Sequence, residues 1–437
     1  MRFRPAFWRF RCCVADARVD ATTGGVKAPP AAPQGRRTAL SQLGGDVELA
    51  GDAQLVETLR HAFDVAATET AALADVHGFH SYPARMHPDT AQRLIARLSP
   101  PGQTVLDPFC GSGTVLVEAR RSSRRGLGFD VNPLSRELSW LKTLGPDDAW
   151  LGALTEEATR VAAHADERRR AKAGATQRYG DVDRAQFAAH VLLELDGLRD
   201  GIHKTERAEL RRALFLVLSA LLTKVSQKSG DSGARATEKR VAPGFPSRFF
   251  LKKTSELCRQ LAAYRDCLPA AAPPAACTLG DARKLPGLAA GSVTLVVSSP
   301  PYPGVYDYLT HHDDRLRWLG LASRDFEQLE IGSRRELSSE SFGPALALWE
   351  RDLGATLTAL SRGLTSDGRI VLVLADSTLA GKPLYAECVV EKAAPAAGLT
   401  LLGRASQARP HFHGGSREAF TKKPRREHLL ALGPAQR

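Results

Sequence analysis

The chain has 437 residues, of which 43% are hydrophobic and 25% charged, an ordinary composition for a globular protein. No apolar run approaches the roughly 20 residues needed to cross a bilayer, so we expect no membrane partner. The scattered cysteines predict a reducing, cytoplasmic location. The net charge of +12 favours a polyanionic partner. The 7 scattered cysteines predict neither a disulfide framework nor a bound metal.

Changes in composition divide the chain into four predicted parts. Residues 1–45 are basic, rich in Ala, Pro and Gly and without periodicity, which predicts a disordered leader and not a signal peptide. Residues 46–145 begin an α/β domain, and their first stretch, 46–75, has the apolar spacing of helix. Residues 146–270 have mostly helical patterns and are predicted to be an insert. Residues 271–437 complete the α/β domain.

A short strand, a Gly-rich turn and a helix follow one another at TVLDPFCGSGT, residues 104–114. The glycines let a ligand approach the backbone, and the helix N-terminus offers free N–H groups to a carboxylate. Leu116 stands where a dinucleotide fingerprint has its third glycine, and Asp107 ends the strand where a pyrophosphate would lie. Both features favour a cofactor with an ammonium and a carboxylate group over NAD.

Two further segments have the pattern of a strand that ends in an acid. Residues 126–130 end in Asp130, about 20 residues after the glycines, where an acid accepts hydrogen bonds from ribose hydroxyls. The segment TLGDA ends in a similar way at Asp281. The sequence therefore predicts a parallel sheet with carboxylates along its carboxyl edge.

The apolar run LVVS ends abruptly at the tetrapeptide SPPY, residues 299–302. Proline cannot continue a strand ladder, so the strand stops at Ser299. A side-chain oxygen, backbone carbonyls and an aromatic ring then meet at the carboxyl end of a strand, where open α/β sheets bind ligands. A planar base with an amino group would suit such a site, although a simple Pro-Pro turn is the alternative.

Two basic segments, Lys224–Arg240 and Arg404–Arg426, are candidates for contact with a phosphate backbone. A solvated surface is the alternative interpretation for both. Residues 1–45 contain a further set of alternating Arg and aromatic residues, for which a nucleic-acid arm is the minority interpretation.

Together, DPFCGSGT (107–114) and SPPY (299–302) resemble the S-adenosylmethionine-dependent amino-methyltransferases of DNA, which modify cytosine N4 or adenine N6. HSYPARM (80–86) resembles the N-terminal motif of the same family, and the similarity covers about 76–144 and 276–432. The resemblance implies an α/β fold with a Rossmann-like class I methyltransferase sheet, helices on both faces and a largely helical insert. That insert is a candidate target-recognition region.

The resemblance also assigns site residues. The implied cofactor-binding residues are Tyr82, Asp107, Phe109, Gly111, Gly113, Thr114, Asp130 and Asp281. The implied catalytic residues, which would hold the target base, are Ser299, Pro300, Pro301 and Tyr302. In this assignment Asp130 takes the ribose of S-adenosylmethionine and Asp281 takes its adenine.

The chemistry of amino methylation agrees with these residues. An exocyclic amine needs acceptors for its N–H groups so that its lone pair can face the methyl donor, and it needs no covalent nucleophile. Methylation at cytosine C5 would need a cysteine, usually after proline, and no Pro-Cys pair occurs. The target base must leave the duplex and would stack on Tyr302.

We therefore expect a site-specific methyltransferase of double-stranded DNA. Serine in the SPPY motif favours cytosine N4 over adenine N6 by resemblance. One alternative is an RNA guanine-N2 or other RNA amino-methyltransferase, which shares both motifs in the same order. The other is a non-catalytic nucleic-acid-binding protein on a methyltransferase scaffold, against which the presence of Asp107, Asp130, Asp281 and Ser299 together counts. A restriction endonuclease is the protein partner that the resemblance allows.

Overall fold

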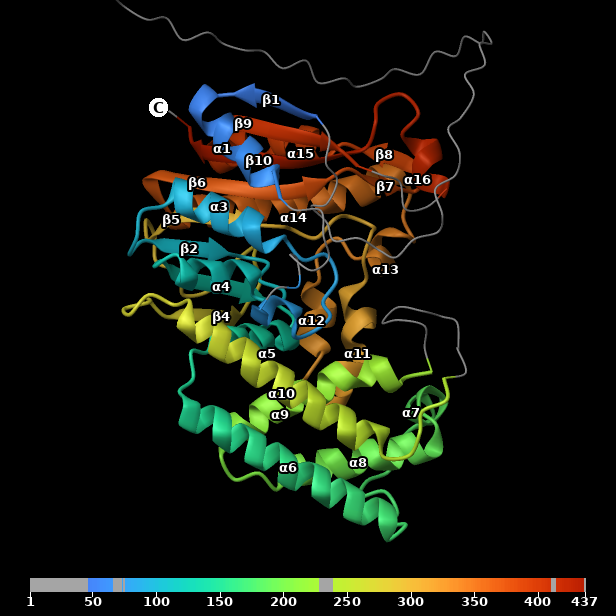
Figure 1. Cartoon of the computed structure of the whole chain (residues 1–437). Coiled ribbons are helices and arrows are strands. Elements are labelled where there is room, and N and C mark those ends of the chain that lie inside the picture. The colour runs from blue at the N-terminus through green and yellow to red at the C-terminus, as the bar shows by residue number, and fades with distance from the viewer. Residues whose placement is uncertain (1–45, 66–72, 74, 228–238, 410–413, 436–437) are drawn as a thin grey trace, which may run out of the picture. The chain divides into compact units, whose positions relative to one another are not determined.

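The computed structural model describes residues 46–65, 73, 75–227, 239–409 and 414–435, all within one compact unit, residues 39–437 (Figure 1). The predicted leader, 1–45, lies outside the described residues. The unit is built around an eight-stranded sheet with helices on both faces. The predicted α/β class is confirmed.

The strands of the main sheet follow the order β1-β9-β10-β6-β5-β2-β3-β4. The five strands from β6 to β4 run parallel, β10 is antiparallel to both β6 and β9, and β1 is antiparallel to β9. This is the Rossmann-like sheet that the resemblance predicted. The bounds are Val47–Gly51 (β1), Thr104–Asp107 (β2), Arg125–Asp130 (β3), Ala275–Leu279 (β4), Val293–Ser298 (β5), Leu364–Ala375 (β6), Leu399–Ala408 (β9) and Arg426–Pro434 (β10).

The direction in which the sheet grows reverses between β2 and β5. From β2 the chain builds outward through β3 to β4, and it then returns to the other side of β2 and builds outward through β5 and β6. The connections that leave β2 and β5 therefore diverge and open a crevice at the carboxyl ends of the strands. Helix α4 (Thr114–Arg121) and the loop 299–307 begin at this point.

The stretch 46–75 differs from the predicted helical segment. It begins with β1, and α1 (Ala53–Phe63) starts only after Asp52, whose side chain accepts a hydrogen bond of 2.8 Å from the backbone N–H of Leu55. A Cβ at Gly51, whose φ is +124°, would lie 2.4 Å from the backbone of β9. Five residues carry too little periodicity to reveal a strand, so pairing with β9 determines the structure here.

Each face of the sheet has its own core. Helices α1, α3 (Pro88–Leu98) and α4 pack on one face, against side chains such as Leu295 and Val297 of β5. Helices α14 (Phe342–Gly363) and α15 (Ala386–Ala393), with η2 (Pro395–Ala397), pack on the other, against Val296. The alternation along β5 is that of a strand buried on both faces.

Five helices lie between α5 and β4 in the chain and form the lower part of Figure 1. All of them except the short helix Asp181–Gln186 share one core with α5 (Pro133–Lys142), to which Leu138, Leu195 and Leu257 belong. Among the described residues, no helix is both long and apolar enough to span a bilayer. The bounds are Asp148–Arg170 (α6), Asp181–Gln186 (α7), Ala189–His203 (α8), Ala208–Val225 (α9) and Phe245–Asp266 (α10).

Several shorter elements complete the described fold. Helices α11 to α13 follow the loop after β5, and a small hairpin, β7–β8, follows β6. The bounds are Asp75–Gly78 (η1), Tyr308–Leu319 (α11), Arg324–Leu329 (α12), Arg334–Leu337 (α13), Ser377–Leu379 (β7), Lys382–Leu384 (β8) and Gly414–Ala419 (α16).

Candidate active site

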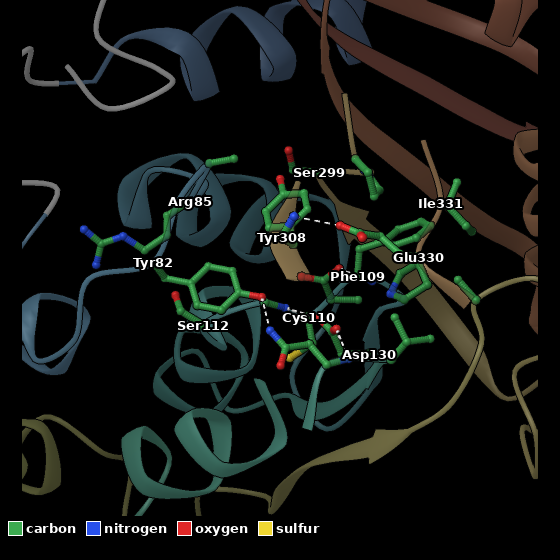
Figure 2. Close-up of a pocket in the computed structure, with 18 of the residues that line it drawn as sticks. Tyr82, Arg85, Phe109, Cys110, Ser112, Asp130, Ser299, Tyr308, Glu330 and Ile331 are labelled. Atoms are coloured by element: carbon green, nitrogen blue, oxygen red, sulfur yellow. Dashed lines mark hydrogen bonds between the residues drawn. The ribbon is translucent and has the colours of Figure 1, made fainter. Parts of the chain in front are cut away.

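One cleft, with about 820 Å³ of space including its open mouth, lies at the carboxyl ends of β2, β3, β4 and β5 (Figure 2). It brings together segments from six parts of the chain, which range from Tyr82 to Ile331. Of the predicted site residues, those that line it are Tyr82, Asp107, Phe109, Gly111, Thr114, Asp130, Asp281, Ser299 and Pro301. Gly113, Pro300 and Tyr302 do not line it.

Asp107 joins the cofactor loop to the strand that carries the catalytic loop. Its Oδ1 accepts a hydrogen bond of 2.6 Å from the hydroxyl of Ser298, the last residue of β5, and one of 3.0 Å from the N–H of Phe109. Burial raises the pKa of Asp107 to about 7 although these bonds oppose the shift. A cationic group bound beside it would favour the carboxylate form.

Asp130 holds the glycine turn. Its Oδ2 accepts the N–H of Gly111 at 2.7 Å and its Oδ1 accepts the N–H of Asn132 at 2.8 Å. Burial raises the pKa of Asp130 to about 6. The residue at position 111 has a φ of +50°, and a Cβ there would lie 3.2 Å from the ring of Tyr82, so glycine fits this turn.

Gly113 acts behind the cleft wall and not on it. Its φ is +83° at the N-cap of α4, and a Cβ there would lie 2.8 Å from the Ser139 hydroxyl oxygen. The glycine therefore allows α4 to start close against α5. No side chain of the described residues caps this end of α4, so its first N–H groups are available to a ligand.

The predicted N-terminal motif closes one side of the cleft. The hydroxyl of Tyr82 lies 2.9 Å from that of Ser135 and accepts a hydrogen bond of 3.3 Å from the Asn132 amide. The ring of Tyr82 lies 4.6 Å from that of His312 and 6.5 Å from that of Tyr308, between centroids. Tyr82 is thus fixed against the start of α5 and against α11, as Figure 2 shows in part.

Asp281 is already paired with a cation. Both of its carboxylate oxygens accept hydrogen bonds from Arg283 Nε, at 2.9 and 3.0 Å, and Arg283 also pairs with Asp352 at 3.2 Å. Contact between Asp281 and adenine stays a prediction, which would use lone pairs that Arg283 leaves open.

The catalytic loop differs from the prediction in the direction of its aromatic ring. Ser299 faces the cleft, but the side chain of Tyr302 is 3% exposed and its hydroxyl points to Glu427 of β10 at 3.3 Å. Pro300 is buried as well. A base in the cleft cannot stack on Tyr302 in this conformation, and the stacking role stays a prediction that requires the loop to move.

Sequence reasoning missed part of the cleft wall. The ring of Tyr308 lies in the cleft, and its backbone N–H donates to Glu330 Oε1 at 2.7 Å. Burial raises the pKa of Glu330 to about 7. The aromatic repeat YPGVYDY after the two prolines could have indicated Tyr308. No motif indicated Glu330, because it reaches the cleft only through the turn that follows α12.

The segment that contains the cofactor loop is similar to known proteins. A family model described as DNA methylase matches residues 59–139. Two curated relatives also match: the type II methyltransferase M.MvaI of Kocuria varians, 41% identical over 70 residues, and the type II methyltransferase M.MjaII of Methanocaldococcus jannaschii, 32% identical over 74 residues. Over residues 59–139 the chain is therefore similar to the DNA methylases. The matches cover 15% and 17% of this chain.

The similarity covers only a small part of these two type II methyltransferases. The matched region spans 15% of the length of M.MvaI and 14% of that of M.MjaII. Among solved structures, the rRNA methyltransferase AviRa of Streptomyces viridochromogenes has a TM-score of 0.31 and 16% identity, covering 85% of this chain and 95% of its own. A TM-score this low carries no argument about fold or function.

The cleft fits S-adenosylmethionine, the cofactor of this family. Its carboxylates can hold an ammonium group and ribose hydroxyls, while the uncapped start of α4 suits a carboxylate. The buried hydroxyl oxygen of Ser112 lines the cleft and has no hydrogen-bond partner among the described residues. A bound carboxylate would supply the partner that Ser112 lacks.

Proposed function

We propose that the protein transfers a methyl group from S-adenosylmethionine to an exocyclic amino group of a base in double-stranded DNA. The observation that supports this best is the bond between Ser298 and Asp107 at 2.6 Å. It fixes the end of β5 against the cofactor loop, so Ser299 stands in the same cleft as the residues that would hold the cofactor. In this proposal the methyl donor and the acceptor site therefore share one cleft.

The acceptor chemistry follows from the catalytic loop. The bound cofactor supplies an electrophilic methyl group. Ser299 Oγ, which lines the cleft, is the acceptor that we assign to one amino proton of the target base. The Pro300 carbonyl stays the predicted acceptor for the other amino proton, and because Pro300 does not line the cleft, that contact requires the loop to move. Fixed acceptors hold the amine so that its lone pair faces the methyl group, and they need no rearrangement during the transfer.

Covalent catalysis through Cys110 does not fit this cleft. The Cys110 thiol is 4% exposed and lies 3.2 Å from the Ser139 hydroxyl, behind the glycine turn. Its interaction with Cys277 and its burial raise the pKa of Cys110 well above the ordinary value. A thiol of this kind stays protonated and is not a nucleophile for carbon methylation. Transfer to an amino nitrogen needs no such group.

We favour cytosine N4 as the target atom, because serine occupies the first position of SPPY. The deciding experiment supplies labelled S-adenosylmethionine with double-stranded DNA and, separately, with tRNA. We expect label in DNA only, recovered as N4-methylcytosine after digestion to nucleosides. Recovery of N6-methyladenine would change the assigned target base to adenine. Label in tRNA alone would replace the proposal by the RNA activity.

Only some of the described basic side chains of the segment 404–426 are exposed and could make the predicted contact with DNA. Arg404 and Lys423 both pair with Glu387, and Arg426 pairs with Glu48. These side chains serve contacts within the protein. Among the described residues of the segment, Arg417 and Lys422 are exposed, and so are Lys224 and Arg240 at the ends of the other basic segment. Residues 228–238 and 410–413 lie outside the described residues.

We expect Arg417 and Lys422 to contact phosphates. Each phosphate contact contributes about 0.9 to the slope of log affinity against log salt concentration for duplex DNA. The double variant R417Q/K422Q is therefore expected to lower that slope by up to about 2. Lys392→Gln is the control, because Lys392 is exposed on α15 and pairs with Glu350. A slope equal to that of the wild type would identify both residues as solvated surface.

A further inference from the structure

The side chain of Tyr302 connects Ser299 to a buried ion pair at the end of the sheet. Ser299 Oγ lies 3.4 Å from Tyr302 Oη, which lies 3.3 Å from Glu427 Oε1. Arg409, directly after β9, donates to the same Glu427 oxygen at 2.9 Å. The side chains of Glu427 and Arg409 are each 1% exposed. This row, Ser299–Tyr302–Glu427–Arg409, crosses from the cleft into the protein interior.

The chemistry of the row determines the direction of its hydrogen bonds. A guanidinium group only donates and a carboxylate only accepts, so Arg409 holds Glu427 as an acceptor. Burial raises the pKa of Tyr302, which keeps the phenol protonated. Its proton therefore points to Glu427 and its oxygen lone pair faces Ser299.

The orientation of the Tyr302 hydroxyl also determines the orientation of the Ser299 hydroxyl, which faces the cleft. A serine hydroxyl can turn either way and can donate or accept. With the Tyr302 lone pair beside it, Ser299 donates its proton away from the cleft and keeps its own lone pairs toward the ligand. The opposite orientation would point the hydroxyl proton at the amine lone pair, which must stay free to attack the methyl group.

We propose that Glu427, acting through Tyr302, is a positioning residue that makes Ser299 a hydrogen-bond acceptor for the amino group of the base. This inference rests on the proposed function, because it assigns a substrate amine to Ser299. The two hydroxyl contacts, at 3.4 and 3.3 Å, are longer than the usual 2.7–2.8 Å or so, so each contributes little to the stability of the fold. The inference also gives Tyr302 a task other than stacking, which depends on its hydroxyl and not on its ring.

A double-mutant cycle tests this assignment. Tyr302→Phe keeps the ring and removes the hydroxyl, and we expect the single-turnover methylation rate to fall about tenfold, the effect of one net hydrogen bond. In the Ser299→Ala background the same change is expected to alter the rate less than about twofold, since the hydroxyl acts only through Ser299. Glu427→Gln alone is expected to lower the methylation rate by the same factor as Tyr302→Phe. Combining the two changes is expected to lower the rate no further. Affinity for S-adenosylmethionine is expected to stay that of the wild type.

A merely structural tyrosine would behave differently. If Tyr302 were only structural, Tyr302→Phe would lower the methylation rate by the same factor in the wild type and in Ser299→Ala. If the ring acted by stacking, Tyr302→Phe would be as active as the wild type. Either result overturns the inference. Tyr179→Phe is the matched control, because the Tyr179 hydroxyl also donates to a buried carboxylate, Asp196 at 2.8 Å, but lies in the insert core. Loss of activity in that control would assign the effect to folding. A wild type that methylates no DNA would instead contradict the proposed function.

Discussion

Purified Ser299→Ala is expected to methylate DNA about a hundred- to a thousandfold more slowly than the wild type in a single turnover. That range is the usual cost of removing one preorganised hydrogen-bonding group that acts on the reacting centre. Ser299 qualifies because its side chain lines the cleft, whereas the neighbouring Ser298 hydroxyl is used by Asp107. No other described hydroxyl follows β5 before Tyr302.

The measurement separates the acceptor role from that of a turn residue. Affinity for S-adenosylmethionine, measured by calorimetry, is expected to be unchanged in Ser299→Ala. Ser292→Ala is the matched control: its hydroxyl donates to the carbonyl of Ala289 in the turn before β5, at 2.6 Å, and it is exposed. A rate for Ser299→Ala close to that of Ser292→Ala would mean that Ser299 only ends a strand.

The predictable parts of the site are those in which glycine or proline determines the local backbone conformation. Glycines at 111 and 113 and prolines at 300 and 301 break strands, so the sequence alone places the cofactor loop and the catalytic loop at strand ends. Parallel strands then bring those ends to one edge of the sheet. The residues Asp107, Asp130 and Ser299 meet in one cleft for this reason.

The parts that were missed depend on distant residues. The direction of Tyr302 is set by Glu427 and Arg409, which are more than 100 positions away in the chain. Arg404 is likewise occupied by an ion pair with Glu387, which makes it less available to DNA. A count of charges in the sequence does not reveal such a pair. Local propensity carries no information on such pairings.

Asp130→Ala is expected to weaken binding of S-adenosylmethionine by about 1.5–3 kcal/mol for each hydrogen bond to the carboxylate that is lost. Two such bonds to the ribose hydroxyls would reduce affinity at least about a hundredfold. The structure adds a second cause, because the variant also frees the N–H of Gly111, which Asp130 holds at 2.7 Å. Calorimetry with the cofactor measures the combined loss.

Asp130→Asn distinguishes the two causes. The amide keeps one oxygen to accept either Gly111 or Asn132 but loses the charge, so we expect a loss of affinity with a smaller loss of thermal stability than in Asp130→Ala. Asp147→Ala is the control: Asp147 also accepts a backbone N–H, that of Trp150 at 2.8 Å, at the start of α6. Removing that cap is expected to cost about 1 kcal/mol of stability and to leave cofactor affinity unchanged. Wild-type affinity in both Asp130 variants would mean that the carboxylate only shapes the glycine turn and that the ribose is held elsewhere.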